Sequence, residues 1–184
     1  MTVVACLGDS ITEGSPHWDS RSRSGDPESQ WEHWSGLQHP ELELRNFGIW
    51  GERTDQIAAR FDEAVEGAAV LIAQGGINDI AQGRPIAEAA RDLRAIVDRG
   101  LGLGLRVAVC DVLPWNGGWP AKEQPIRGLN ALIHRLPVPV LAFHDTLEDP
   151  VAPGRMKPEW CNEDGDHPSV AGYRRLGELA FRLP

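Results

Sequence analysis

Short apolar runs alternate with amphipathic stretches along the whole chain, which is the pattern of a protein built from alternating strands and helices. Fully apolar runs such as 69–73 predict buried strands, whereas the alternation at 41–45 predicts a half-exposed strand. Stretches such as 54–65 place apolar residues three and four positions apart, the spacing of one helix face. The predicted strands are 3–7, 41–45, 69–73, 105–113 and 138–143, and the predicted helices are 30–37, 54–65, 85–99, 123–136 and 169–181.

This alternation predicts the fold class. Five strands with helices between them favour an α/β protein, a three-layer α/β/α arrangement with a five-stranded parallel sheet covered on both faces. Ligands of such sheets bind beyond the carboxyl ends of the strands. The length of 184 residues favours one domain over residues 1–184. The polar segment 15–29 is too short and too early to separate two domains, so we interpret it as a mobile loop.

Composition narrows the classes of function. The chain has 18 Lys and Arg against 27 Asp and Glu, a net charge of −9, and no basic cluster for nucleic acid or anionic membrane. No apolar run is long enough to span a bilayer, and residues 1–6 lack the features of a signal peptide. We therefore expect a cytoplasmic protein that binds neither nucleic acid nor membrane. The three cysteines form no CxxC motif, so neither a zinc ribbon nor a redox site is predicted.

Residues with catalytic potential stand at the ends of predicted strands. Ser10 follows the first strand, where its backbone N–H could help to hold an oxyanion. His167 precedes the last helix, and histidine is the usual base for a serine nucleophile. Such a histidine needs an acceptor on its other ring nitrogen, and Asp164, three positions earlier, is preferred over the adjacent Asp166. The structural alternatives are a helix cap at Ser10 and a solvated loop around His167.

Two further segments offer hydrogen-bond donors at strand ends. Residues 46–51, NFGIWG, follow the second predicted strand, and residues 75–79, GGIND, follow the third. Glycines let backbone N–H groups approach a ligand closely, and Asn78 carries an amide donor. Taken alone, each segment is also a common turn at the end of a strand.

Together the four segments resemble the SGNH hydrolases, also called GDSL-type esterases and lipases. The resemblance rests on GDSIT at 8–12, NFGIWG at 46–51, GGIND at 75–79 and DGDHPS at 164–169, in the order of the family's motifs. It implies a flavodoxin-like strand order. It also implies hydrolysis of small-molecule esters without a metal or an organic cofactor.

The resemblance also implies a role for single residues. Ser10 corresponds to the nucleophile, and Asp164 and His167 correspond to its triad partners. The oxyanion donors would be the Ser10 N–H, Gly51 and Asn78, with Gly48 as the weaker candidate in the second segment. Two further matches are expected to form hydrogen bonds that shape loops, namely Asp9 and Asp79.

Other interpretations fit the sequence less well. The GxSxG elbow of α/β-hydrolases is missing, and a metallophosphoesterase would need more His and Asp ligands at strand ends. The glycine-rich stretch 100–104 follows a helix rather than a strand, so it is not a dinucleotide loop. We interpret His144 and Asp145, at the end of the fifth predicted strand, as packing or loop-anchoring residues. A carbohydrate-binding module on the same fold is the non-enzymatic alternative.

The substrate class is the least constrained feature. The resemblance allows short-chain esters, acetylated sugars, thioesters and lysophospholipids. The chain has no long apolar lid segment, and Trp50, Trp115 and Trp119 lie in predicted strand-end loops where they would wall a compact pocket. We therefore predict a short-acyl esterase, with carbohydrate deacetylation as the favoured role and lysophospholipase or thioesterase-type activity as the alternative. The negative charge disfavours phosphate-bearing substrates, unless Arg21 and Arg23 form a local basic patch.

Overall fold

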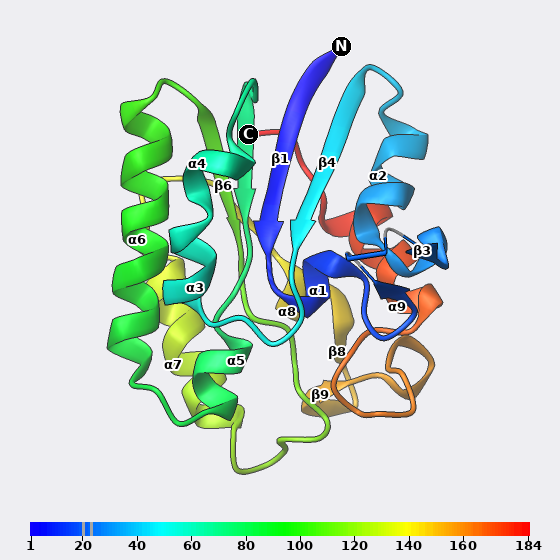
Figure 1. The fold of residues 1–184 in the computed structure, drawn as a ribbon. Helices are drawn as coiled ribbons and strands as arrows, with labels where there is room; N and C mark the ends of the chain where they lie inside the picture. Colours follow the sequence, from blue (N-terminus) through cyan, green and yellow to red (C-terminus); the bar gives the residue numbers. More distant parts are fainter. Residues whose placement is uncertain (20, 23) are drawn as a thin grey trace.

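A five-stranded parallel sheet forms the centre of the computed structural model, which describes every residue except Ser20 and Arg23 (Figure 1). All neighbouring strands pair in parallel, as is typical of flavodoxin-like sheets with this strand order. The predicted fold class and sheet are thereby confirmed. In spatial order the strands are β4 (Leu42–Gly48), β1 (Thr2–Gly8), β5 (Val70–Ala73), β6 (Arg106–Cys110) and β7 (Val140–Leu141).

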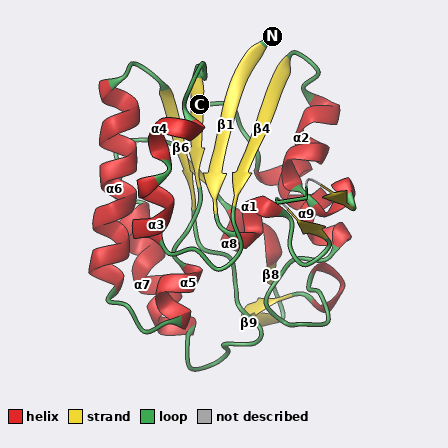
Figure 2. Ribbon diagram, viewed as in Figure 1, coloured by secondary structure: helices red, strands yellow, loops and turns green. Residues whose placement is uncertain are grey.

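Helices cover both faces of this sheet (Figures 1 and 2). One face carries α3 (Thr54–Ala59), α4 (Phe61–Ala64), α5 (Ile77–Ala81), α6 (Ile86–Gly102) and α7 (Glu123–Ile133). The other face carries α2 (Trp31–Gln38), α8 (Phe143–Leu147), α9 (Val170–Arg175) and the π-helical turn η3 (Leu176–Ala180).

Each face of the sheet has its own apolar core. Ile57, Leu93 and Leu129 belong to the core under α3, α6 and α7. Trp31 and Phe143 belong to the core on the opposite face. Every residue of β5 is buried, because this central strand contributes side chains to both cores.

Several predicted elements have different bounds in the structure. The predicted helix 54–65 is divided at Arg60, whose guanidinium donates to the carbonyl oxygens of Phe47 at 3.0 Å and Gly8 at 3.1 Å. The predicted strand 138–143 is wrong for most of its length, since only two residues pair with β6 before Phe143 begins α8. Leu37, placed on the apolar face of its helix by the spacing, is exposed.

The shortest elements were not predicted, because two to five residues are too few to show a period. Three of them, β2, β3 and η1, lie in the interval 15–29, which is interpreted above as a loop. Arg23, one of the two residues of the suggested basic patch, lies outside the described residues. None of the helices in the described part of the chain has the length and apolar character of a membrane span. The unpredicted elements are α1 (Ser10–Glu13), β2 (Trp18–Asp19), β3 (Ser24–Gly25), η1 (Pro27–Ser29), β8 (Glu148–Asp149), β9 (Ala152–Met156) and η2 (Pro158–Trp160), together with α5 and α8.

Candidate active site

The serine of the first segment lies at the carboxyl end of β1. Ser10 is the first residue of α1 and is buried. Asp9 caps this short helix, because its carboxylate accepts a hydrogen bond from the Ile11 N–H at 2.9 Å. A side chain at Gly8 would collide with Thr12, so the tight passage from strand to helix requires glycine here.

A histidine from the other end of the chain reaches this serine. The Nε2 atom of His167 lies 3.0 Å from the Oγ atom of Ser10. The Nδ1 atom of the same ring lies 2.7 Å from the Oδ2 atom of Asp164. An imidazole between a hydroxyl and a carboxylate can take the hydroxyl proton while the carboxylate fixes its orientation. The structure therefore brings these three sequence-predicted residues into one hydrogen-bonded row.

The turn that carries this histidine is built by the same carboxylate. Its Oδ1 atom accepts hydrogen bonds from the N–H groups of Asp166 at 2.8 Å and His167 at 3.0 Å. Partial burial raises the pKa of Asp164, but these two N–H groups and the imidazole outweigh burial and lower it below its ordinary value. Asp164 is therefore held as a carboxylate beside the ring.

The second and third segments lie against each other. The side-chain amide of Asn78 donates to the carbonyl of Glu52 at 3.0 Å, directly after Gly51 in the chain. Gly51 has a positive φ of 77°, which favours glycine. Among the described residues, the N–H groups of Ser10 and Gly51 donate to no protein acceptor, and Asn78 uses its amide nitrogen in only this one bond. These groups are thus available to a ligand oxygen.

Gly48, the weaker oxyanion candidate, has a structural task. Its N–H is already donated to the side-chain oxygen of Asn46 at 2.8 Å. A side chain at this position would collide with the backbone of Glu13 in α1. The amide nitrogen of Asn46 donates to the Thr12 carbonyl, so this pair of residues fastens α1 to the end of β4.

Asp79 forms the loop-shaping hydrogen bonds expected of it. It is fully buried and accepts from both the N–H and the hydroxyl of Thr54 at 2.9 Å. The guanidinium of Arg84 lies 2.6 Å from the same carboxylate. This network fixes the start of α3 next to α5, and with it the segment that contains Asn78.

The three tryptophans proposed as pocket walls differ in their surroundings. Trp115 packs against the core and donates its indole N–H to Asp166 at 2.6 Å, one residue before His167. Trp50 and Trp119 are 68% and 43% exposed, and the guanidinium of Arg155 lies 5.3 Å from the ring centre of Trp119. Only Trp115 is thus shown in contact with the histidine turn.

Two contacts near the site were not expected from the sequence. The side chain of Gln74 accepts from the Asp9 N–H at 3.1 Å and from the Thr12 hydroxyl at 2.9 Å, which ties the end of β5 to the serine turn. The N–H of Gly117 donates to the carbonyl of Gly165 at 2.9 Å. For the first contact, the sequence offered one indication, namely that Gln74 directly precedes the GGIND segment.

Comparison with known proteins identifies the family. The model of the GDSL-like lipase/acylhydrolase family matches residues 6–175, so the chain belongs to this family. Membership supports a hydrolase activity of the acylhydrolase and esterase type. Among curated protein sequences, none matches significantly.

Solved structures with the same fold are similar over nearly the whole chain. A structure assigned to the G-D-S-L lipolytic family, from Desulfitobacterium hafniense, has a TM-score of 0.79 and 23% identity and covers 97% of both chains. A lipase/acylhydrolase from Enterococcus faecalis has a TM-score of 0.76 and 20% identity and covers 97% of this chain and 93% of its own. An acetylxylan esterase from Geobacillus stearothermophilus has a TM-score of 0.76 and 18% identity, with 96% and 90% covered.

Proposed function

We propose that this protein is a serine esterase that hydrolyses short-chain acyl esters, with acetylated carbohydrates as its favoured natural substrates. The observation that carries the proposal is the hydrogen-bonded row of Ser10, His167 and Asp164. Membership of an acylhydrolase family supports the same reaction class.

The proposed reaction has two halves. The Oγ atom of Ser10 attacks the ester carbonyl as Nε2 of His167 takes its proton, and Asp164 stabilises the imidazolium. The proton then passes to the departing alcohol, which leaves a covalent acyl-serine. Water, deprotonated by the same ring, releases the acyl group as a carboxylic acid and restores the serine hydroxyl.

Three donors are proposed to stabilise the negative oxygen of each tetrahedral intermediate. They are the N–H groups of Ser10 and Gly51 and the side-chain amide of Asn78. The free N–H groups at the first two positions, and the anchoring of the third on Glu52, support this assignment. Removal of one such donor typically lowers the rate about 10²–10³-fold.

The substrate class is proposed from the tryptophans. Trp115 is a bulky side chain beside the histidine turn, which favours a short acyl group. The exposed rings of Trp50 and Trp119 offer faces on which a sugar can stack. One structural neighbour is an acetylxylan esterase, but at 18% identity it supports the fold, so the carbohydrate proposal rests on this chain's own residues.

A covalent probe tests the proposed nucleophile. We expect a fluorophosphonate to add one adduct to the wild-type protein, and peptide mass spectrometry to find it on Ser10. The Ser10→Ala variant should remain unlabelled, while Ser22→Ala, which changes a serine hydroxyl on an exposed loop, should label like wild type. Labelling at a different residue would identify another nucleophile, and the absence of labelling in folded protein would favour a binding module instead of an enzyme.

Substrate profiling separates the proposed substrate class from the alternatives. We expect kcat/KM for p-nitrophenyl esters to be highest for acetate or butyrate and to fall towards palmitate. Acetate should be released from acetylated xylan. Each methylene buried in a long pocket contributes about 0.8 kcal/mol, so a rise in kcat/KM beyond eight carbons would indicate a lysophospholipase-type site. A preference for acyl-thioesters over oxygen esters of the same length would favour the thioesterase alternative.

A further inference from the structure

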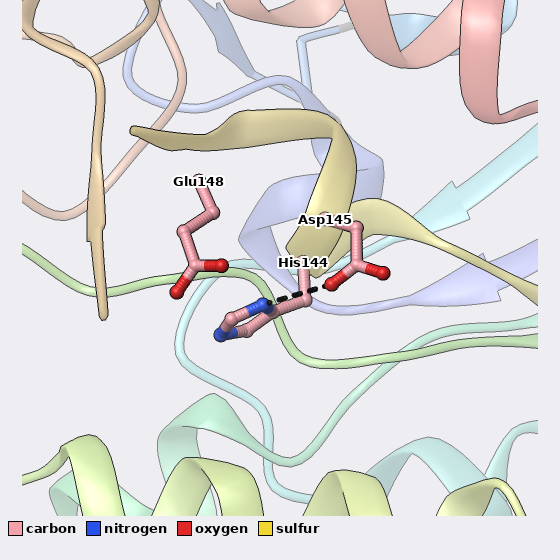
Figure 3. A group of neighbouring side chains, drawn as sticks. All are labelled: His144, Asp145 and Glu148. Carbon is pink, nitrogen blue, oxygen red and sulfur yellow. Dashed lines mark ion pairs between the residues drawn. The ribbon is translucent and has the colours of Figure 1, made fainter. Parts of the chain in front are cut away.

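A second group of histidine and carboxylate side chains lies at the opposite edge of the sheet from β4, beyond β6 and β7. His144 and Asp145 belong to α8, and Glu148 is the first residue of β8. One ligand atom from each lies within 4.8 Å of the other two. Figure 3 shows the imidazole between the two carboxylates. The three types of side chain are common metal ligands.

The imidazole of His144 is deeply buried and poorly partnered. Its side chain is 7% exposed, and the nearest carboxylate oxygen, Oδ1 of Asp145, lies 3.5 Å from Nδ1. Within the part of the chain that the structure describes, neither ring nitrogen makes a hydrogen bond. Neither ring nitrogen is among the buried polar atoms that lack a partner, so both are open to the solvent of the adjoining cavity. An accessible neutral imidazole readily donates its lone pair to a metal ion.

The ring faces a cavity in which negative groups outnumber positive ones. The cavity has a volume of about 190 Å³, and its walls include Asp111, Asp145 and both His134 and His144. Among the described residues that line the cavity, the one guanidinium is that of Arg127, which donates a hydrogen bond to the Oε1 atom of Glu148 at 3.0 Å. The other oxygen of this carboxylate makes no hydrogen bond within the described residues. The local charge therefore favours a cation.

We propose that His144, Asp145 and Glu148 bind a divalent transition-metal ion of the zinc type. Two ligands of a tetrahedral Zn²⁺ with bonds of about 2.0–2.1 Å lie about 3.3 Å apart. The 3.5 Å between Nδ1 of His144 and Oδ1 of Asp145 is close to this separation. A ligand set with an imidazole nitrogen favours Zn²⁺ over Mg²⁺, which prefers oxygen ligands alone. Water completes the fourth position.

The protein already holds the first ligand in place. The N–H of His144 donates to Oδ1 of the buried Asp111 at 2.8 Å, and His134 lies 3.0 Å from the other oxygen of that carboxylate. The proposed ion would connect α8 to β8, two elements that meet at residue 148. This structural role goes beyond the packing role expected from the sequence and is independent of the proposed esterase reaction.

Calorimetric titration of the chelator-treated, dialysed full-length protein with ZnCl₂ at pH 7.5 tests the site. We expect one equivalent to bind, and at least tenfold weaker binding in both His144→Ala and Asp145→Asn. The second variant guards against misfolding of the first, because the Asp145 side chain is 84% exposed. The matched control is His39→Ala. It removes another histidine beside a carboxylate, at 3.3 Å from Glu41, where no third ligand lies within reach among the described residues, and it should bind as tightly as wild type.

Three results would overturn the proposal. The first is the absence of saturable Zn²⁺ binding to the wild-type protein. The second is binding that persists in the His144→Ala and Asp145→Asn variants but is lost in His167→Ala, which would place the ion at the serine site. The third is binding of MgCl₂ as tight as that of ZnCl₂, which would contradict a site selected by an imidazole ligand.

Discussion

The histidines His167 and His144 stand beside carboxylates in different ways, and the difference between them separates two kinds of chemistry. Both ring nitrogens of His167 are engaged, at 2.7 Å from Asp164 and 3.0 Å from Ser10. The carboxylate oxygen closest to the ring of His144 lies 3.5 Å from Nδ1, and this ring makes no hydrogen bond within the described residues. Hydrogen bonds on both nitrogens define a path for a proton. A ring without them is suited to bind a metal ion.

A buried aspartate after a strand underlies each histidine site. Asp9 follows β1 and Asp111 follows β6, and burial raises the pKa of both carboxyl groups. Both oxygens of Asp111 are hydrogen-bonded, to the His144 N–H and the His134 ring. The Oδ2 atom of Asp9 has no partner in the described residues. The serine site thus contains a buried aspartate oxygen without a partner, whereas both oxygens of the corresponding aspartate at the second site are hydrogen-bonded.

The largest effect is expected from removing the Asp164 carboxylate, which lies beside the proposed catalytic histidine His167. Asp164→Asn replaces the carboxylate beside Nδ1 of His167 with an amide and removes the negative charge that faces the ring. We expect kcat for p-nitrophenyl acetate to fall about 10³–10⁴-fold, since the ring loses its tautomer preference and its stabilising charge. Steady-state kinetics on folded protein, verified by circular dichroism, measures this loss.

Asp166→Asn is the matched control for this substitution. Asp166 lies in the same turn, but its side chain accepts a hydrogen bond from Trp115 and none from the histidine. Asparagine keeps an acceptor oxygen, so kcat should stay within about threefold of wild type. Equal losses in the two variants would mean that Asp164 has no special relation to the histidine ring.

The second-largest effect is expected on the stability of the fold, and it concerns Asp9, the buried aspartate with an unpartnered oxygen. Burial raises the pKa of Asp9 from 3.8 to about 6 in the folded state. Between these two values the unfolded chain has ionised the group and the folded chain has not, so wild-type stability is lost as the pH rises towards 6. This difference in pKa between the unfolded and the folded state corresponds to about 3 kcal/mol in the free energy of unfolding. Asp9→Asn removes this dependence.

Urea unfolding of wild type and Asp9→Asn from pH 4 to pH 8 measures this difference. We expect the variant to gain stability relative to wild type as the pH rises from 4 to 6, and the difference to be constant above that. Asn keeps the oxygen that accepts from the Ile11 N–H, so the helix cap is preserved. A stability difference that does not change with pH would show that Asp9 is ionised in the folded protein at pH 4 and above.

Local patterns predicted the fold class, and the resemblance of four strand-end segments to the SGNH hydrolases pointed to the residues of the serine site. The strands after which Ser10 and Asn78 stand are visible as apolar runs, and Asp164 and His167 are close in the chain, so one turn joins them. The break of a helix at Arg60 was not predictable, because it depends on carbonyl groups of two strands. The second histidine site was missed for a similar reason, since it needs the early end of β7 and the start of α8.

The smallest effect is expected at a contact between segments that are distant in the chain. The indole N–H of Trp115 donates to Asp166 at 2.6 Å and braces the turn that carries His167. Trp115→Phe keeps an aromatic ring in the core but removes this hydrogen bond. The loss should raise the activation free energy by about 1 kcal/mol, because the turn that carries His167 is held less firmly. We expect kcat for p-nitrophenyl acetate to fall about 3–10-fold with KM within twofold. Trp119→Phe, which alters an exposed indole, should leave kcat for this small ester unchanged. If Trp115→Phe raises KM and leaves kcat intact, Trp115 contacts the substrate instead of positioning the histidine turn.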